Sequence, residues 1–209
     1  MSDLQREREF PFVGNHLCMD FVNTQVIQNG EAVDLLETFD DLMAWSVQAK
    51  MLEPATAQEM TRRWRSSGKT DKAFDQAIEL RAGLREMAER SARGQKAAGQ
   101  ALLDGINDVL RARIGHAEIV KARSGYEMRN HVELTEPIHL LVPVAESAAD
   151  LLSHGDPTLI RKCQNPECIL YFYDTTKNHA RRWCSMSGCG NRAKVAAHYR
   201  RQRRARTVT

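Results

Sequence analysis

Four of the five cysteines in this chain lie close together near its C-terminal end. They form two C-x4-C pairs separated by 15 residues, a spacer long enough for a hairpin: Cys163, Cys168, Cys184 and Cys189. Two thiol pairs of this kind supply the four tetrahedral positions around a metal ion, with one pair on each knuckle. Because all four donors are sulfur, no position remains for water, and the pattern predicts one structural Zn²⁺ per chain rather than a catalytic ion.

Two disulfide bonds, another metal or a redox thiol switch are the alternative interpretations of the same cysteines. Disulfide frameworks are typical of small, loop-rich chains in oxidising compartments. This chain has 209 residues, and its polar start MSDLQREREF lacks the apolar segment of a signal peptide. No stretch approaches the roughly 18 apolar residues of a membrane span. We therefore expect a cytoplasmic protein with reduced thiols and no membrane partner.

The region around and after the cysteines is strongly basic. Residues 161–209 contain 12 Lys and Arg against 2 acidic residues, whereas residues 1–160 contain 18 basic and 25 acidic residues. A basic segment attached to an acidic body predicts contact with nucleic acid, most simply double-stranded DNA. The candidate contact residues are Arg181, Arg182, Arg192, Lys194, Arg200, Arg201, Arg203, Arg204 and Arg206.

The segment 191–206 has neither Pro nor Gly and is rich in helix formers, so it predicts a basic helix. We expect a small apolar face on this helix to pack on the zinc hairpin, through Ala193, Ala196 and Ala197. A zinc knuckle followed by such a helix can present arginines to phosphates or to a major groove. Charge compensation of the four thiolates is the alternative role for Arg181 and Arg182. RNA binding, or docking on an acidic protein, are the alternatives for the whole region.

The run from Cys163 to Arg192 resembles the CGNR zinc finger family, whose tetrad stands here at residues 189–192. The C-x4-C pair, the strand YFYD and the run RRWCSM match that family as well. The segment GNHLCMDFVNT at residues 14–24 resembles the opening of the ABATE domain, with Met19 in place of a family Leu. The resemblance implies a bacterial, stress-induced transcription regulator in which this domain precedes the finger.

The fold class predicted from the apolar periodicity is α+β, mainly α. We expect a helical ABATE-like domain over 1–156 and, over 157–209, a four-cysteine zinc finger made of a hairpin and the basic helix. The predicted helices of the body span 37–51, 54–66, 71–93, 96–114 and 138–152. Between the last two, alternating apolar and polar residues over 126–134 predict a strand with only one face exposed to water, paired in a hairpin with 117–123.

Asp20, Asn23 and Thr24 are polar residues within an otherwise apolar segment of the N-terminal motif. Burying them requires hydrogen-bond partners, and we expect them to bond to neighbouring backbone. The alternative is that they line a small-molecule pocket that tunes the finger. No nucleophile elbow, phosphate-binding loop or zinc-protease motif is present, so we expect a regulator rather than an enzyme. We expect the body of this regulator to sense a ligand or to form a homodimer.

Overall fold

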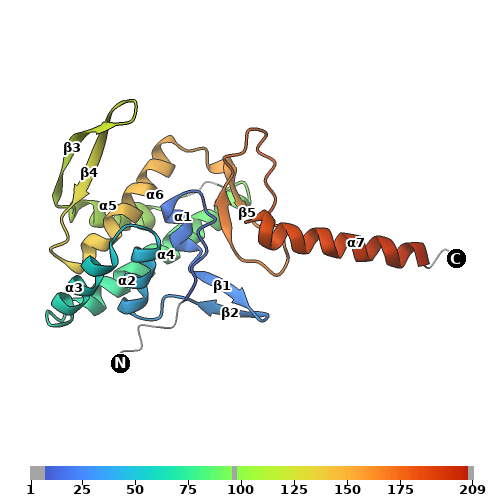
Figure 1. The fold of residues 1–209 in the computed structure, drawn as a ribbon, viewed down its shortest axis with the longest axis horizontal. Helices are drawn as coiled ribbons and strands as arrows, with labels where there is room; N and C mark the ends of the chain where they lie inside the picture. The colour runs from blue at the N-terminus through green and yellow to red at the C-terminus, as the bar shows by residue number, and fades with distance from the viewer. Residues whose placement is uncertain (1–7, 96–97, 207–209) are drawn as a thin grey trace.

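The computed structural model describes residues 8–95 and 98–206, and Figure 1 shows the arrangement of its elements. The N-terminal part contains α1 (Leu17–Val22), β1 (Gln25–Gln28), β2 (Glu31–Asp34), α2 (Phe39–Gln48), α3 (Pro54–Arg65), α4 (Thr70–Ala92) and α5 (Gln100–Arg111). It continues with β3 (Gly115–Ala122), β4 (Gly125–Val132), the 3₁₀ turn η1 (Pro137–Leu141) and α6 (Val142–His154). The C-terminal part contains the 3₁₀ turn η2 (Pro157–Leu159), β5 (Ile160–Lys162), β6 (Tyr171–Tyr173), the π-helical turn η3 (Met186–Gly190) and α7 (Asn191–Arg206).

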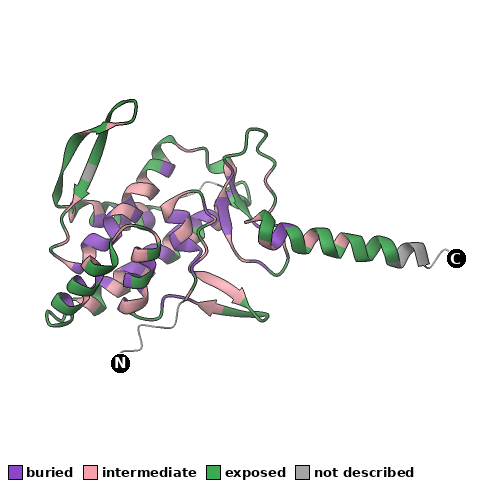
Figure 2. Cartoon of the chain, viewed as in Figure 1, coloured by how far each residue is buried: buried purple, intermediate pink, exposed green. Residues whose placement is uncertain are grey.

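The core of the body lies where α1, α4, α5 and α6 meet (Figure 2). Helix α4 buries one stripe of its surface, including Ala77, Leu84 and Ala88 at helical spacing. The short helix α1 is different, since Met19 and Phe21 on its different sides are both fully buried. A helix that is apolar on nearly all sides belongs inside the core, and this places the N-terminal motif at the centre of the molecule.

The mainly helical α+β fold predicted from the sequence is confirmed, and four of the predicted helices are observed as α2, α3, α4 and α5. Helix α2 begins with a capping box between Thr38 and Asp41, and α3 begins with Pro54 in its first turn. The helix predicted over 138–152 is instead divided into η1 and α6. Pro143 has no N–H to donate to the carbonyl of His139, so the chain enters α6 through a 3₁₀ turn.

The predicted hairpin is present as the antiparallel pair β3–β4, but the expectation of a covered apolar face was wrong for most of its length. Tyr126 and Met128 are 76% and 71% exposed, and Ile119 beside them is 76% exposed. The hairpin extends away from the body, and its base packs on the core through Val132 (Figure 1). Alternation correctly predicted which residues share a face, although nothing covers that face among the described residues.

Helix α7 extends outward from the finger, and its predicted packing on the zinc hairpin was wrong (Figure 1). Ala196 is exposed, while Ala193 and Ala197 are half-buried. The methyl groups of three alanines offer little apolar area, and the larger apolar residues of the helix, Val195 and Tyr199, are 53% and 61% exposed. Figure 2 shows its described surface as almost entirely exposed. None of the helices within 8–95 and 98–206 combines the length and hydrophobicity that crossing a membrane requires.

An ion pair between a buried arginine and a half-buried aspartate links α4 to the β1–β2 hairpin. Arg81 is 3% exposed and forms paired hydrogen bonds with Asp34, at 2.6 Å from Nη1 to Oδ1 and 2.5 Å from Nη2 to Oδ2. Its Nη1 also donates to the hydroxyl of Thr24 at 2.8 Å. Burial acts to raise the pKa of Asp34, but hydrogen bonds from Arg81 and from the Leu36 N–H outweigh it and hold that pKa below its usual range.

We expect Arg81→Met to lower the free energy of unfolding by roughly 1.5–3 kcal/mol, the usual worth of hydrogen bonds to a charged group. Since the pKa of Asp34 is lowered in the folded state, this stabilisation is present above the unfolded value of 3.8 and disappears as pH falls through the folded value. Urea denaturation of both proteins across an acid series measures the difference. Arg65→Met is the control, because Arg65 is 58% exposed and its surface pair with Asp40 contributes at most about 1 kcal/mol. Equal losses in the two variants would contradict the prediction.

Candidate metal centre and its contact with the body

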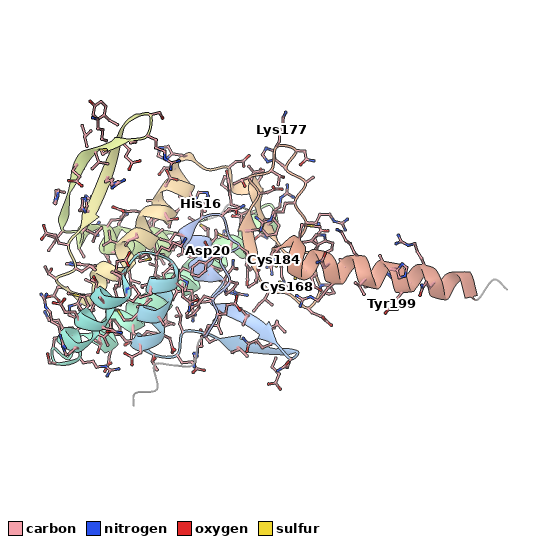
Figure 3. All side chains as sticks on the ribbon, viewed as in Figure 1. His16, Asp20, Cys168, Lys177, Cys184 and Tyr199 are labelled. Carbon is pink, nitrogen blue, oxygen red and sulfur yellow. The ribbon has the colours of Figure 1, made fainter. Side chains whose placement is uncertain are left out.

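The sulfur atoms of the four predicted ligands lie close together in the finger, at the base of α7 (Figure 3). All four cysteines are buried, and their sulfur atoms lie within 4.8 Å of one another. The Sγ of Cys184 lies 3.8 Å from that of Cys168 and 3.6 Å from that of Cys189. Zn–S bonds of about 2.3 Å in a tetrahedron place the sulfurs about 3.8 Å apart, whereas a disulfide bond is about 2.05 Å long. The residues present therefore fit one structural Zn²⁺, and the four cysteines are free rather than paired in disulfide bonds.

Each knuckle is closed by a polar residue. In the first, Asn165 accepts from the backbone N–H of Cys168 through its backbone carbonyl oxygen, at 3.0 Å. Its side-chain amide then donates to the Sγ of Cys189 across the site, at 3.3 Å. In the second, the hydroxyl of Ser185 accepts from the N–H of Gly188 at 3.1 Å. These turns hold the sulfurs in position, so the x4 spacing forms knuckles although it is longer than the usual x2.

Four thiols in so small a space cannot all ionise without a cation. Hydrogen bonds from Cys168 and Cys184 lower the pKa of Cys163, and the same contact with Cys163 raises the pKa of Cys168 to about 12. The pKa of Cys184 is raised by the same contacts. The four cysteines would hold Zn²⁺ as thiolates, and the charge of the ion would offset theirs. Outside the ligand set, Arg192 donates from Nη2 to the Sγ of Cys189 at 3.1 Å and offsets part of their charge.

Asp174 closes the loop that returns the second cysteine pair to the first. It is fully buried and accepts hydrogen bonds from the N–H and hydroxyl of Thr176, at 3.0 and 2.6 Å, and from the N–H of Arg181, at 2.9 Å. Burial acts to raise the pKa of Asp174, but these hydrogen bonds outweigh it and lower that pKa. Next to it, Phe172 is fully buried against the cysteines, with the guanidinium of Arg181 4.1 Å from its ring centre.

Asn23, for which a pocket role was the alternative interpretation, bonds to the finger. Its side-chain NH₂ donates to the carbonyl of Tyr171 at 2.8 Å, and its side-chain oxygen accepts from the N–H of Tyr171 at 2.9 Å. Asn23 is fully buried and Tyr171 is 3% exposed. The amide therefore pairs with β6 as the backbone of a neighbouring strand would, and it satisfies two polar groups that water does not reach.

The chain segment before α1 extends this contact. The carbonyl of Gly14 accepts from the N–H of Tyr173 at 2.9 Å, and Asn15 donates from its side chain to the carbonyl of Tyr173 at 2.9 Å. Asp20 anchors the segment by accepting from the N–H of Gly14 at 2.7 Å. A Cβ at Gly14 would lie 2.6 Å from the Cβ of Met19, so only glycine fits this approach. Burial raises the pKa of Asp20 to about 6.

Arg181 completes these contacts from the finger side. Its Nη2 donates to the carbonyl of Val13 at 2.8 Å and to that of Cys184, and its Nε donates to the carbonyl of Trp183 at 3.0 Å. Burial lowers the pKa of Arg181, although nearby negative groups act against this shift. We refer to the whole set of contacts as the body–finger latch, formed by Val13, Gly14, Asn15, Asp20 and Asn23 with Tyr171, Tyr173 and Arg181.

The structure places the predicted nucleic-acid residues in different surroundings. Arg181 is directed into the latch, and Arg192 is bonded to Cys189. Arg182 is exposed, beside Gln164 and the ring of Trp183. Besides Arg192, the exposed basic residues of α7 with described side chains are Lys194, Arg200 and Arg201. Arg203, Arg204 and Arg206 belong to the last turns of α7, and their side chains lie outside the described part of the structure.

The three residues for which a pocket was the alternative interpretation are held by hydrogen bonds within the protein. Asn23 and Thr24 are fully buried, and Thr24 bonds to the carbonyl of Phe21 as well as to Arg81. Asp20 bonds to Gly14. An open cavity of 490 Å³ lies nearby between the N-terminal segment, β1 and the zinc knuckles, and none of the three residues lines it. Asp20 thus bonds to neighbouring backbone as expected, whereas the partner of Asn23 is Tyr171, which is distant in the sequence.

Sequence reasoning missed Gly14 and Asn15 as part of the latch. Their signal was a Gly-Asn pair, typical of a turn, directly before the apolar run of α1. Asn15 has a φ of 64°, in the left-handed region that asparagine tolerates better than most residues. No local signal indicates that Tyr171 and Tyr173, more than 140 residues later, would be the partners of this segment.

Comparison with protein families gives two matches that follow one another along the chain. The family model described as "Putative stress-induced transcription regulator" (ABATE) matches residues 15–155, more than half of the chain. The model of the CGNR zinc finger matches residues 160–202 and contains all four cysteines. No curated protein matches the chain.

We expect the purified protein to contain one zinc ion per chain and Cys184→Ser to lose most of it, since a thiolate ligand is removed. Structural zinc in small fingers supplies on the order of 10–16 kcal/mol of apparent binding free energy, so the finger of this variant should also unfold. Elemental analysis and hydrogen exchange of residues 163–190 measure the two effects. Cys18→Ala is the control, because Cys18 lies in the core of the body and burial raises its pKa to about 12. Equal zinc contents in the two variants would contradict the assignment.

We expect Asn23→Ala to lower the free energy of unfolding by roughly 1–3 kcal/mol, because it leaves the buried N–H and C=O of Tyr171 without partners. Thermal and urea unfolding measure the loss, and faster exchange of the Tyr171 amide locates it in the latch. Asn178→Ala, at an exposed position in the finger loop, should stay within about 0.5 kcal/mol of the parent protein. An Asn23→Ala protein with unchanged stability would instead favour a pocket role for Asn23.

Proposed function

Because the chain belongs to the ABATE family of transcription regulators and carries a CGNR zinc finger, we propose that it regulates transcription by binding double-stranded DNA through α7. The observation that carries the proposal is the exposed basic helix held at the end of a zinc-bound turn. The finer parts of the proposal are that the protein acts in a bacterial cytoplasm during stress and catalyses no reaction of its own.

The shape of α7 suits a groove of DNA. The helix has 16 residues, so it is about 24 Å long, and a major groove is about 12 Å wide. It starts directly after η3, which contains Cys189, so its first turn is fixed to the metal centre. The described residues beyond that turn are mostly exposed, and Figure 1 shows the helix clear of the body. A duplex can therefore approach it without displacing other elements.

The charge of α7 also favours an anionic partner. Its sequence NRAKVAAHYRRQRRAR contains seven Arg and Lys and no acidic residue. Arg200 and Arg204 are four residues apart, and like charges at this spacing destabilise an isolated helix by about 0.2–0.5 kcal/mol per pair. Phosphate groups would remove this repulsion and release condensed counterions. Binding nucleic acid thus stabilises the helix that does the binding.

Fewer residues are proposed to contact DNA phosphates than the number of basic residues suggests. Arg181 is used in the latch and Arg192 offsets thiolate charge, so neither is a free phosphate ligand in this conformation. Among the residues with described side chains, the proposal rests on Lys194, Arg200 and Arg201. Arg182 extends the set toward the body, while Arg203, Arg204 and Arg206 extend it along the helix in sequence.

The body has a second proposed role as the part that regulates α7. We propose that it senses a small ligand or forms a homodimer, since the latch joins it directly to β6 and Arg181 of the finger, which lie between the two pairs of zinc ligands in sequence. Asp20, Asn23 and Thr24 enter this proposal as the residues through which a ligand would act on the finger. RNA binding and docking on an acidic protein are the alternative functions of the finger.

We expect the affinity for a labelled duplex to fall with salt, by about 0.9 units of log Kd per phosphate contact for each tenfold increase in salt concentration. Replacing both Arg200 and Arg201 with Ala should reduce the magnitude of this slope by about 1–2 units and weaken all sequences similarly. Fluorescence anisotropy across a salt series measures the slope. The control replaces Arg62 and Arg63 with Ala, because these are two exposed arginines on α3 of the body.

The same measurement separates the alternatives. Tighter binding of a structured RNA than of duplex at equal salt would favour RNA as the partner. Salt-independent affinity, or equal slopes for the two double variants, would contradict phosphate contact by α7. Failure to bind either nucleic acid, together with an absorbance ratio typical of pure protein, would favour the acidic protein partner.

A further inference from the structure

Three possible metal ligands meet on one face of the β3–β4 hairpin, well separated in sequence from the cysteines. His116 and His131 are directly paired across the two strands, and Glu118 follows His116 by two residues on the same face. The two imidazole rings are stacked with centroids 5.2 Å apart, and Oε1 of Glu118 lies 2.6 Å from Nε2 of His131. One donor atom from each residue lies within 4.8 Å of the other two.

The neighbouring charged residues on this face do not separate the three candidate ligands. The register places Arg129 opposite Glu118, and a cross-strand pair of these two would be the ordinary arrangement. Arg129 instead donates from Nε to Glu127 at 2.7 Å, and Glu118 is directed to His131. The carboxylate therefore lies beside two imidazoles, a combination that offers one oxygen and two nitrogen donors from two strands.

We propose that His116, Glu118 and His131 bind one divalent transition-metal ion, such as Zn²⁺ or Ni²⁺. Imidazole nitrogen and carboxylate oxygen are ordinary ligands of these ions. Bonds of about 2.0–2.1 Å in a tetrahedron require donor atoms about 3.4 Å apart. All three side chains are exposed, so rotation about their side-chain torsions closes the remaining distance without moving the strands. The ion takes the place of the direct contact between Glu118 and His131.

This centre differs from the finger in both ligands and role. The finger presents four thiolates in a closed, buried site, whereas the hairpin presents three donors and leaves at least one position to water or another ligand. An isolated two-stranded hairpin is marginally stable in water, and both faces of this one are largely exposed. An ion held by His116 on β3 and His131 on β4 joins the strands and fixes their register.

The test is a calorimetric titration of the zinc-loaded full chain, without a polyhistidine tag, with NiCl₂. The expected result is one bound nickel ion in addition to the zinc of the finger. His131→Ala removes a direct ligand, so it should weaken nickel binding by more than the roughly 10–100-fold that loss of an outer-shell partner costs. Hydrogen exchange supplies a second readout, because nickel should slow the amides of residues 115–132 in the parent protein and not in the variant.

His154→Ala is the matched control, since His154 is also an exposed histidine beside a carboxylate, 3.1 Å from Asp150, but belongs to no group of three metal-ligating side chains within residues 8–95 and 98–206. It should bind nickel like the parent protein. Zinc is measured in the same samples to show that the finger keeps its ion. Nickel uptake matched by zinc release, absence of an additional bound ion, or equal affinities of the parent protein and His131→Ala would each overturn the proposal.

Discussion

The two hydrogen bonds between the side chain of Asn23 and the backbone of Tyr171 fix the position of the finger on the body. Their strength comes from burial, since neither group has access to water and an unpaired backbone group would cost about 1–3 kcal/mol. They set the position of β6, and with it Phe172 against the sulfur cluster and Asp174 at the start of the closing loop. The geometry of the metal centre is thus tied to a residue almost 150 positions earlier in the chain.

The zinc site and the latch fix different degrees of freedom. Zinc holds four sulfurs in a tetrahedron and so orients η3, from which α7 continues without a break. The latch holds the finger against α1, the most deeply buried helix of the body. Arg181 belongs to both, since it bonds to the carbonyls of Val13 and Cys184. The direction of α7 relative to the body is therefore determined by a continuous series of contacts, along which a ligand or partner of the body would have to act.

The sequence predicts the parts of this structure that depend on local spacing. Metal geometry requires paired cysteines, and helix packing requires a 3.6-residue period, so the four ligands and most helices could be identified. The sequence does not predict which residues from distant parts of the chain contact one another. Asn23 was expected to bond to nearby backbone, and its partner is instead Tyr171 in the finger. Arg181 was counted with the DNA contacts because of its charge, although it is directed inward. The alternation that grouped Met128 with Tyr126 could not show that this face lacks a covering element.

The position of β5 and β6 bears on how the chain can be divided. The break near residue 156 separates the two family matches, and it suggests two pieces that could be produced independently. Ile160 and Tyr171, however, are 2% and 3% exposed and belong to the core of the body. A fragment that begins at 157 would carry these apolar side chains into water, and its counterpart would retain Asn23 with no strand to pair. The finger therefore cannot be transferred to another protein by itself. The transfer would require the α1 segment as well.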